Sequence, residues 1–381
     1  MPRWIRVYLV PGAVFQSIVV GGGYGTGREL VEYFVQYGIA GAFKGLALAT
    51  VLFGAIIGLT FEFARVFQAF DYRNFLRRLI GPIWPLYEIN YLLTVVLVLA
   101  VVASAAAEVI EDSLGLPGMA GGALMLTLIV ALNFYGRDVI KAVFSVWSVV
   151  LYVVFGVFVI ALFMNHSNDI SQGFAVASSD SGWLKGSIAY VGYNVSAAII
   201  ALFAIRDFRS RREAIGSGAA AAVIAMLPAT LFTAGFAAGY PEIVEQSLPN
   251  YFMLELLGVP WITALFLIVL VGTFAETGAG LIQGVNERFD AWLVERRGSP
   301  GTRGAHGLLA LGAVILSSGM ATFGVITLVE KGYGLMAWGG ILFYIIPLLI
   351  IGPWRLLREQ REGQLARGDL AEPDTTEEPQ S

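Results

Sequence analysis

The stretch Val19–Tyr33, which reads VVGGGYGTGRELVEY, holds the residues of this chain that are best suited to chemistry. Five of the seven residues in Gly21–Gly27 are glycine, and the charged residues Arg28, Glu29 and Glu32 follow directly. Each glycine inside a helix costs about 1 kcal/mol relative to alanine, and a charge at the centre of a membrane helix costs roughly 2.5 to 3.5 kcal/mol. Apolar residues lie on both sides, so the sequence predicts a membrane helix that is broken here.

A broken helix of this kind can bind a ligand through its backbone. Unwound backbone is tolerated at membrane depth where it is buried in protein or lines a cavity, and its free carbonyl and amide groups can hold an ion or a small polar molecule. Glycines also let two helices approach closely, but three glycines spaced by four residues would serve that purpose. We therefore interpret the stretch as a binding segment, with these candidate solute ligands: Gly21, Gly22, Gly23, Tyr24, Gly25, Thr26, Gly27, Arg28 and Glu29.

The charged residues after the glycines divide between two helical faces. Arg28 and Glu32 are four residues apart, so they share a face and can neutralise each other. Their pairing is either structural or one half of an outer gate. Glu29 points about 100 degrees away and is expected to face the cavity, where it either binds a cationic group or takes up a proton.

The composition places the chain in a membrane. Of the 381 residues, 57% are apolar and 14% are charged, whereas a soluble domain averages about 25% charged residues. We therefore predict an all-α, polytopic membrane protein. There is no cysteine, which excludes disulfides and thiol nucleophiles. Residues 359–381 are largely acidic and polar, so we expect a disordered cytoplasmic tail after a membrane domain of residues 1–358.

Apolar runs of about 20 residues, the length that crosses a bilayer, occur ten times. They lie near residues 9–37, 42–67, 82–110, 118–135, 139–164, 184–206, 212–238, 252–287, 305–327 and 333–355. With the N-terminus in the cytoplasm, twenty of the 24 basic residues fall in cytoplasmic segments. The outer loops keep only three lysines: Lys44, Lys185 and Lys331. This bias predicts that both termini are cytoplasmic.

Ten crossings with this orientation can form two inverted halves of five, at about residues 5–165 and 183–355. The sixth crossing is then the counterpart of the first. Its middle contains Gly192, Tyr193 and Asn194, again an aromatic residue beside glycine, followed by a polar residue at membrane depth. Paired interruptions in matching positions of two halves point to the binding site of a transporter. We therefore predict that these three residues also bind the solute.

This organisation resembles the LeuT-type fold of the amino acid, polyamine and organocation superfamily. The segment GGGYGTGRELVEYF at Gly21–Phe34 is similar to that of the YkvI-like membrane proteins of bacteria, and the similarity covers about residues 5–355. The resemblance implies a central site between the first, third, sixth and eighth helices. It also implies an aromatic wall from the third helix, to which Tyr87 or Tyr91 is suited, although an interfacial aromatic belt explains these tyrosines equally well.

The resemblance further implies a sodium site between the first and eighth helices. Its ligands here would be the carbonyl groups of Val20 and Gly23 and the hydroxyl groups of Thr273 and Thr277, because hard cations prefer oxygen ligands. Adjacent hydroxyl residues are usual at this level of helix eight, whereas this chain has Glu276 beside Thr277. Glu276 could complete a sodium site, carry a proton, or be a buried glutamate bonded to a neighbouring helix.

These features predict an ion-coupled secondary transporter of a small polar solute, such as an amino acid or amine, that works by alternating access in the bacterial inner membrane. A channel and a solute-sensing membrane receptor are the alternatives. We expect no enzyme activity and no cofactor other than a coupling Na+ or H+, because motifs of hydrolases and ATP-binding modules are missing. The expected partners are the solute and the lipid bilayer, and not nucleic acid. The sequence leaves open the solute, the coupling ion, symport or antiport, and the oligomeric state.

Overall fold

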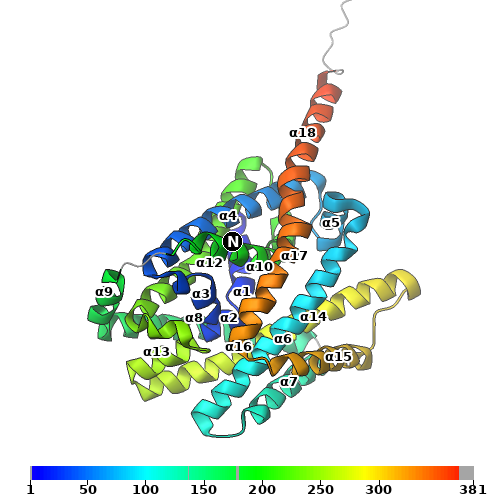
Figure 1. Cartoon of the computed structure of the whole chain (residues 1–381). Helices are drawn as coiled ribbons and strands as arrows, with labels where there is room; N and C mark the ends of the chain where they lie inside the picture. The colour runs from blue at the N-terminus through cyan, green and yellow to red at the C-terminus, as the bar shows by residue number, and fades with distance from the viewer. Residues whose placement is uncertain (1, 136, 177–179, 369–381) are drawn as a thin grey trace, which may run out of the picture.

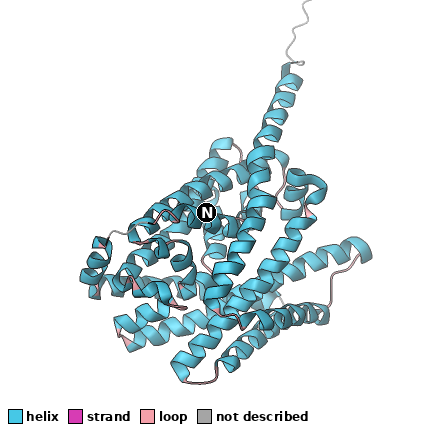
Figure 2. Cartoon of the chain, in the orientation of Figure 1, coloured by secondary structure: helices cyan, strands magenta, loops and turns pink. Residues whose placement is uncertain are grey.

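The computed structural model describes residues 2–135, 137–176 and 180–368. Within these ranges the chain is built of helices and loops and has no strand (Figure 2). The helices form one bundle, from which the last helix extends well beyond the rest (Figure 1). This confirms the predicted all-α fold.

Eight helical segments of the described chain are long and apolar enough to cross a membrane. They are α4 (Ile39–Phe67), α6 (Pro85–Leu114), α7 (Gly118–Tyr135), Trp183–Ile205, α12 (Arg211–Phe236), α14 (Pro260–Arg297), α15 (Arg303–Ala321) and Val325–Glu359. A ninth candidate combines α8 (Arg137–Asn165) with α9 (Ser167–Ala175), which meet at a bend of 79°. The interrupted segment at the N-terminus precedes them, so the arrangement is consistent with the ten predicted crossings.

The first crossing is interrupted where the glycines predict it. It starts with a π-helical turn, η1 (Ile5–Leu9), and continues as α1 (Val10–Val19). The helix then opens at Val20 and Gly21, whose ψ angles are 69° and −149°. A short α2 (Gly22–Thr26) follows, and Gly27 adopts the left-handed conformation with φ of 78° before α3 (Arg28–Tyr33). Glycine adopts such angles without the steric penalty that other residues incur.

The sixth crossing is interrupted at the predicted place, but far less than the prediction of an unwound segment implies. Its first helix α10 (Trp183–Asn194) ends before Val195, whose φ and ψ of −61° and −26° are still right-handed helical. A short α11 (Ser196–Ile200) and the 3-10 turn η4 (Ala201–Ile205) complete it. One glycine, Gly192, in an otherwise helix-compatible run explains why the axis is not opened.

The predicted starts of two crossings need correction. The eighth crossing does not begin at residue 252, because Gly258, with φ of 64°, and Pro260 separate a short α13 (Pro249–Leu257) from α14, which extends to Arg297. The tenth begins at Val325 rather than 333, through α16 (Val325–Thr327), the π-helical η7 (Leu328–Tyr333), α17 (Gly334–Gly340) and the π-helical η8 (Ile341–Ile345). Its last helix, α18 (Ile346–Gly368), continues past residue 358, so the predicted tail begins within this helix. The rest of the predicted tail, residues 369–381, lies outside the described residues.

Ion pairs mark one end of the bundle, which we call the N-terminal end. Arg3 pairs with Glu213 at 2.6 Å and Arg6 with Asp207 at 3.2 Å, which joins the start of the first crossing to the start of α12. The short helix α5 (Tyr72–Ile80) packs against α11 and α18 at this end (Figure 1). The opposite end, called the far end below, carries the segments that follow α3, α8 and α12.

The helices α4 and α12 have the most extensive contact in the described bundle. Small residues allow it: a Cβ atom on Gly218 of α12 would lie 2.3 Å from the backbone nitrogen of Gly58 in α4. Close approach through small residues is a common basis of helix packing in membranes. This contact joins the second and seventh crossings, which are counterparts in the two inverted halves.

Candidate functional site

The break in the first crossing lies against the eighth. A Cβ atom on Gly21 would be 3.1 Å from the Oγ1 atom of Thr277 in α14, and one on Gly25 would be 2.6 Å from Leu270. The structure therefore brings together the glycine segment and the level of α14 at which the sequence predicts ion ligands. Thr273, one turn away, is buried and donates a hydrogen bond of 2.8 Å to the carbonyl of Val269 in its own helix.

Protein donors already occupy most carbonyl groups of the break. The Gly23 carbonyl, a predicted ion ligand, accepts hydrogen bonds from the Gly27 N–H at 3.1 Å and the Thr26 hydroxyl at 2.9 Å. The Gly21 carbonyl accepts hydrogen bonds from two backbone N–H groups of α2. Val20, the other predicted backbone ligand, is buried and has non-helical dihedral angles. An ion at Gly23 would therefore need a rearrangement of α2.

Asn250 of α13 also binds the break. Its Nδ2 atom donates hydrogen bonds to the carbonyl oxygens of Tyr24 at 2.6 Å and Gly25 at 3.0 Å. The side chain is fully buried, and its Oδ1 atom has no hydrogen-bond partner. Asn250 lies in the segment of residues 240–259, which includes α13 and is called the loop before α14. Sequence reasoning missed this residue because nothing in its local pattern shows that this segment reaches the first crossing.

Arg28 joins the same loop to α3. Its Nη1 atom donates to the carbonyl oxygens of Val244 at 2.8 Å and Gln246 at 3.0 Å, and its Nη2 atom to Glu32 at 2.8 Å. The predicted pair of Arg28 and Glu32 is thus present, and the Arg28 side chain is 5% exposed. Arg28 therefore holds the loop over the far end of the first crossing, in the position that a gate requires.

Glu29 faces into the protein, away from Arg28's partners. It is buried, its carboxyl group lies against Gly23, and its Oε2 atom has no hydrogen-bond partner. Among the residues that the structure describes, no ion pair includes Glu29. Tyrosines from four elements lie within range of its charge: Tyr24, Tyr33, Tyr190, Tyr193 and Tyr333. Glu29 is therefore a buried carboxyl group near these tyrosines. It does not line the cavity between the third, sixth and tenth crossings, so its predicted position at the solute cavity stays a prediction.

These tyrosines connect the first crossing to the sixth. The hydroxyl groups of Tyr24 and Tyr190 are 2.8 Å apart and share a hydrogen bond. The rings of Tyr193 and Tyr333 are stacked, with centroids 4.2 Å apart, which adds the tenth crossing. Tyr190 and Tyr333 were not among the predicted site residues. Tyr190 is in the same motif as Gly192, but Tyr333 is brought here only by the path of the tenth crossing.

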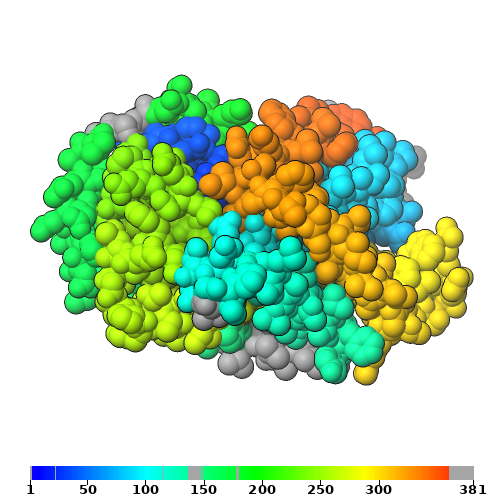
Figure 3. Space-filling view, turned by 60° about the horizontal axis from the view of Figure 1, so that its bottom comes forward, coloured from blue at the N-terminus to red at the C-terminus, as the bar shows by residue number. Residues whose placement is uncertain are grey.

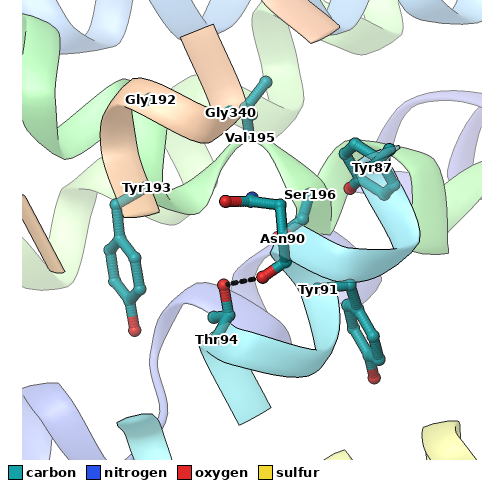
Figure 4. Close-up of a pocket in the computed structure, with 9 residues that line it drawn as sticks. All are labelled: Tyr87, Asn90, Tyr91, Thr94, Gly192, Tyr193, Val195, Ser196 and Gly340. Atoms are coloured by element: carbon teal, nitrogen blue, oxygen red, sulfur yellow. Dashed lines mark hydrogen bonds between the residues drawn. The ribbon is translucent and has the colours of Figure 1, made fainter. Parts of the chain in front are cut away.

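A small cavity lies between the third, sixth and tenth crossings (Figure 4). Four of its lining residues are predicted site residues: Tyr87, Tyr91, Gly192 and Tyr193. The other five are Asn90, Thr94, Val195, Ser196 and Gly340. The predicted Asn194 is not among them, since its Nδ2 atom donates to the carbonyl of Tyr190 in its own helix at 3.1 Å. The glycine segment does not line this cavity either, so the predicted solute ligands form two adjacent groups.

An ion pair closes the cavity on the side of the N-terminal end. Arg288 of α14 is 3.1 Å from Glu88 of α6, and its guanidinium group lies 3.6 Å from the ring centroid of Tyr91 and 4.3 Å from that of Tyr72. Contacts of a cation with aromatic faces stabilise such an arrangement. Tyr72 lies on α5, outside the membrane crossings, where burial and the charge of Glu88 raise the pKa of its hydroxyl to about 12. Its hydroxyl is therefore neutral at physiological pH.

The remaining predicted ion ligand, Glu276, is half-buried on α14, and its charge acts on Tyr152 of α8. It faces the fifth crossing, whereas Thr277 faces the first. Among the described residues, no group of three or more histidine, aspartate or glutamate side chains could hold a metal ion. The expected sodium ligands are instead carbonyl and hydroxyl oxygens.

A larger groove opens at the far end between α3, α10 and α17, with a volume of about 780 Å³. Its polar lining comes from Glu32, Gln36, Lys185, Glu330 and Lys331. Tyr33 also lines the groove, and its ring contacts that of Tyr190 with a centroid distance of 5.7 Å. The groove is thus separated from the buried tyrosine cluster by one side chain. In Figure 3 the blue surface of the first crossing lies between green and orange surfaces in this region.

Comparison with models of known protein families gives no match. The chain is 24% identical over 292 residues to the uncharacterized membrane protein YkvI of Bacillus subtilis (strain 168), and the match covers 74% of this chain and 80% of that protein. This similarity agrees with the resemblance carried by the glycine motif and with a multi-pass membrane protein.

Two solved structures are similar over most of the chain. A Na+-coupled sialic acid symporter in a substrate-bound, outward-open state has a TM-score of 0.61 at 12% identity, covering 90% of this chain and 78% of that one. MhsT in complex with L-phenylalanine has a TM-score of 0.56 at 15% identity, covering 92% and 97%. The chain therefore has the LeuT-type fold that the sequence resemblance implied.

Proposed function

We propose that this protein is an ion-coupled secondary transporter that moves a small polar solute across the bacterial inner membrane by alternating access. The observation that carries the proposal is the direct contact of Tyr24 and Tyr190, which joins the broken first crossing to the sixth at a buried polar cluster. In a protein of this fold, two such crossings are suited to hold a solute between them. The solved transporters of the same fold support the assignment.

The solute would bind between the first, third and sixth crossings. The cavity beside Tyr87, Tyr91, Gly192 and Tyr193 is adjacent to the tyrosine cluster around Glu29, so a modest movement would join the two spaces. Carboxylate and hydroxyl groups suit an amino acid or an amine, whose ammonium group they can bind. In this scheme Glu29 receives either that cationic group or a proton, and the backbone of Gly21–Gly27 binds the solute once its own hydrogen bonds are released.

In this scheme both ends of the pathway would be closed, as in a carrier between its two open forms. Arg28 and Asn250 hold the loop before α14 at the far end. Arg288, Glu88 and Tyr91 close the cavity at the N-terminal end. The coupling ion would lie between Thr277 and the first break, with Glu276 nearby, and it would be Na+ or H+.

The basic residues support an orientation with both termini in the cytoplasm, so the far end would be outside. We propose residues 1–358 as the transport domain, with repeats at about 5–165 and 183–355, and residues 359–381 as a cytoplasmic tail. No enzymatic step is part of this function.

A ligand screen followed by flux tests the proposal. Purified protein is heated with amino acids and amines, with and without sodium, because a ligand that binds only the folded state raises its melting temperature. Compounds that do so are then offered to proteoliposomes in radiolabelled form. Saturable uptake supports a carrier, ion currents without saturation indicate a channel, and binding without uptake indicates a receptor.

A further inference from the structure

The groove at the far end has a distribution of charge that the transport pathway does not explain. Only three lysines lie in the segments of the far side, and two of them, Lys185 and Lys331, line this one groove. Neither lysine takes part in an ion pair with another described residue. Glu32 in the same lining pairs with Arg28, which leaves two ammonium groups and one carboxylate, that of Glu330. The net positive charge favours an anion at this groove.

The rest of the groove is apolar and open to the surroundings of the bundle. Ile188 of α10 and Leu335 and Trp338 of α17 line it and are 42%, 65% and 64% exposed. These residues lie on two helical segments, Trp183–Ile205 and Val325–Glu359, that are long and apolar enough to cross a membrane, so the medium that they meet is lipid rather than water. Between them the floor contains the small residues Gly186 and Gly334.

The groove also has the depth of half a bilayer. Along the tenth crossing its lining runs from Lys331 to Ile341, which are ten positions apart. At 1.5 Å per residue this is roughly 15 Å, and the hydrocarbon core of a membrane is about 30 Å thick. The lysines are at the outer end of this path, and the apolar residues are deeper. A ligand that fits must therefore have an anionic head and an apolar chain about one leaflet long.

We propose that this groove binds an anionic phospholipid, with its phosphate between Lys185 and Lys331 and an acyl chain along α10 and α17. Charge complementarity selects an anionic lipid over a zwitterionic one, because the lysines would repel the ammonium group of a zwitterionic headgroup. The bound lipid would lie against Tyr33 and Gly186, and so against the moving first and sixth crossings. This site is separate from the proposed solute site and does not depend on it.

The test uses the full-length protein in detergent, with phosphatidylglycerol, phosphatidylcholine and inorganic phosphate as separate probes. Binding is read by native mass spectrometry and by melting temperature. We expect phosphatidylglycerol to remain bound and to raise the melting temperature, and the other two probes to do neither. Equal effects of the two lipids would overturn the proposal, and so would an equal effect of phosphate, which would indicate a simple anion site.

Two sets of variants locate the lipid. The double variant Lys185→Gln, Lys331→Gln should bind phosphatidylglycerol about thirtyfold more weakly, because each basic residue near an anionic lipid contributes a factor of about five. Lys44→Gln, at the same end on α4, is the matched control and should bind normally. Unchanged binding by the double variant would overturn the proposal.

Gly334→Leu fills the groove and leaves both lysines in place. A Cβ atom at Gly334 meets nothing within 4 Å, so the variant should fold, and the same holds for the control Gly312→Leu on α15. We expect Gly334→Leu to lose the bound lipid and Gly312→Leu to keep it. Retention of the lipid by both would contradict an acyl chain in the groove.

Discussion

Removal of Arg28 should release the loop that closes the far end of the bundle. Its two hydrogen bonds to the carbonyls of Val244 and Gln246, at 2.8 and 3.0 Å, are the charged contacts that connect α3 to this loop. A hydrogen bond from a charged group contributes about 1.5 to 3 kcal/mol. Water replaces part of the two bonds when the loop opens, so we take the lower limit, about 3 kcal/mol in total. This equals roughly a hundredfold change in the ratio of closed to open forms.

The chain has no cysteine, which allows a direct assay. Thr26→Cys introduces one thiol at a position that is 1% exposed behind this loop. The rate of its reaction with a membrane-impermeant maleimide reports the open population. We expect the rate to rise about a hundredfold when Arg28→Ala is added.

Two controls accompany this experiment. Arg28→Lys keeps the charge beside Glu32 but loses the forked geometry that reaches two carbonyls, so its labelling rate should be intermediate. Arg65→Ala removes another arginine that pairs with a nearby glutamate, Glu62, but on α4, and should leave the rate unchanged. If Arg28→Ala folds with an unchanged labelling rate, Arg28 does not hold the loop closed and the reasoning is refuted.

Three further predictions concern the break and the two buried charges. Gly27→Ala should lower the melting temperature more than Gly258→Ala. Both glycines have left-handed backbone angles, which cost alanine about 1 to 2 kcal/mol, but only at Gly27 would the new Cβ atom also lie 2.8 Å from the Phe236 ring. Equal decreases in melting temperature would contradict this close approach. Glu29→Gln should abolish uptake or strongly shift it, and uptake at the original level with the original pH dependence would disprove the assigned role. Arg288→Gln leaves the half-buried Glu88 without its partner, so a Thr94→Cys thiol in the cavity should react faster from the N-terminal end. An unchanged rate would show that the pair is not a barrier.

The sequence contained enough to predict the break in the first crossing, because five glycines in seven residues cannot be accommodated cheaply in a helix. Its counterpart in the sixth crossing was overestimated, since Gly192 alone does not open a helix whose other residues keep helical angles. The start of α14 was misplaced because the apolar run through residues 252–259 hid the turn at Gly258 and Pro260.

The parts of the site that were missed are those made by distant segments. Asn250 bonds to Tyr24 across 226 positions, and Tyr24 to Tyr190 across 166. No local periodicity encodes such contacts, because they depend on how the crossings pack. Glu29 is buried, which agrees with its angle relative to Arg28 and Glu32 on one helix, and its role at a solute cavity stays a prediction.

The central claim is that a solute is carried between the first and sixth crossings, and counterflow tests it most directly. Proteoliposomes are loaded with an unlabelled amino acid or amine found in the thermal screen, and entry of the labelled compound is measured for the unmodified protein and for the Thr26→Cys variant after maleimide treatment. The account predicts saturable uptake that internal solute accelerates, and loss of this uptake when the thiol beside the break is modified. Uptake that neither saturates nor responds to internal solute, or that persists after complete modification, would contradict it.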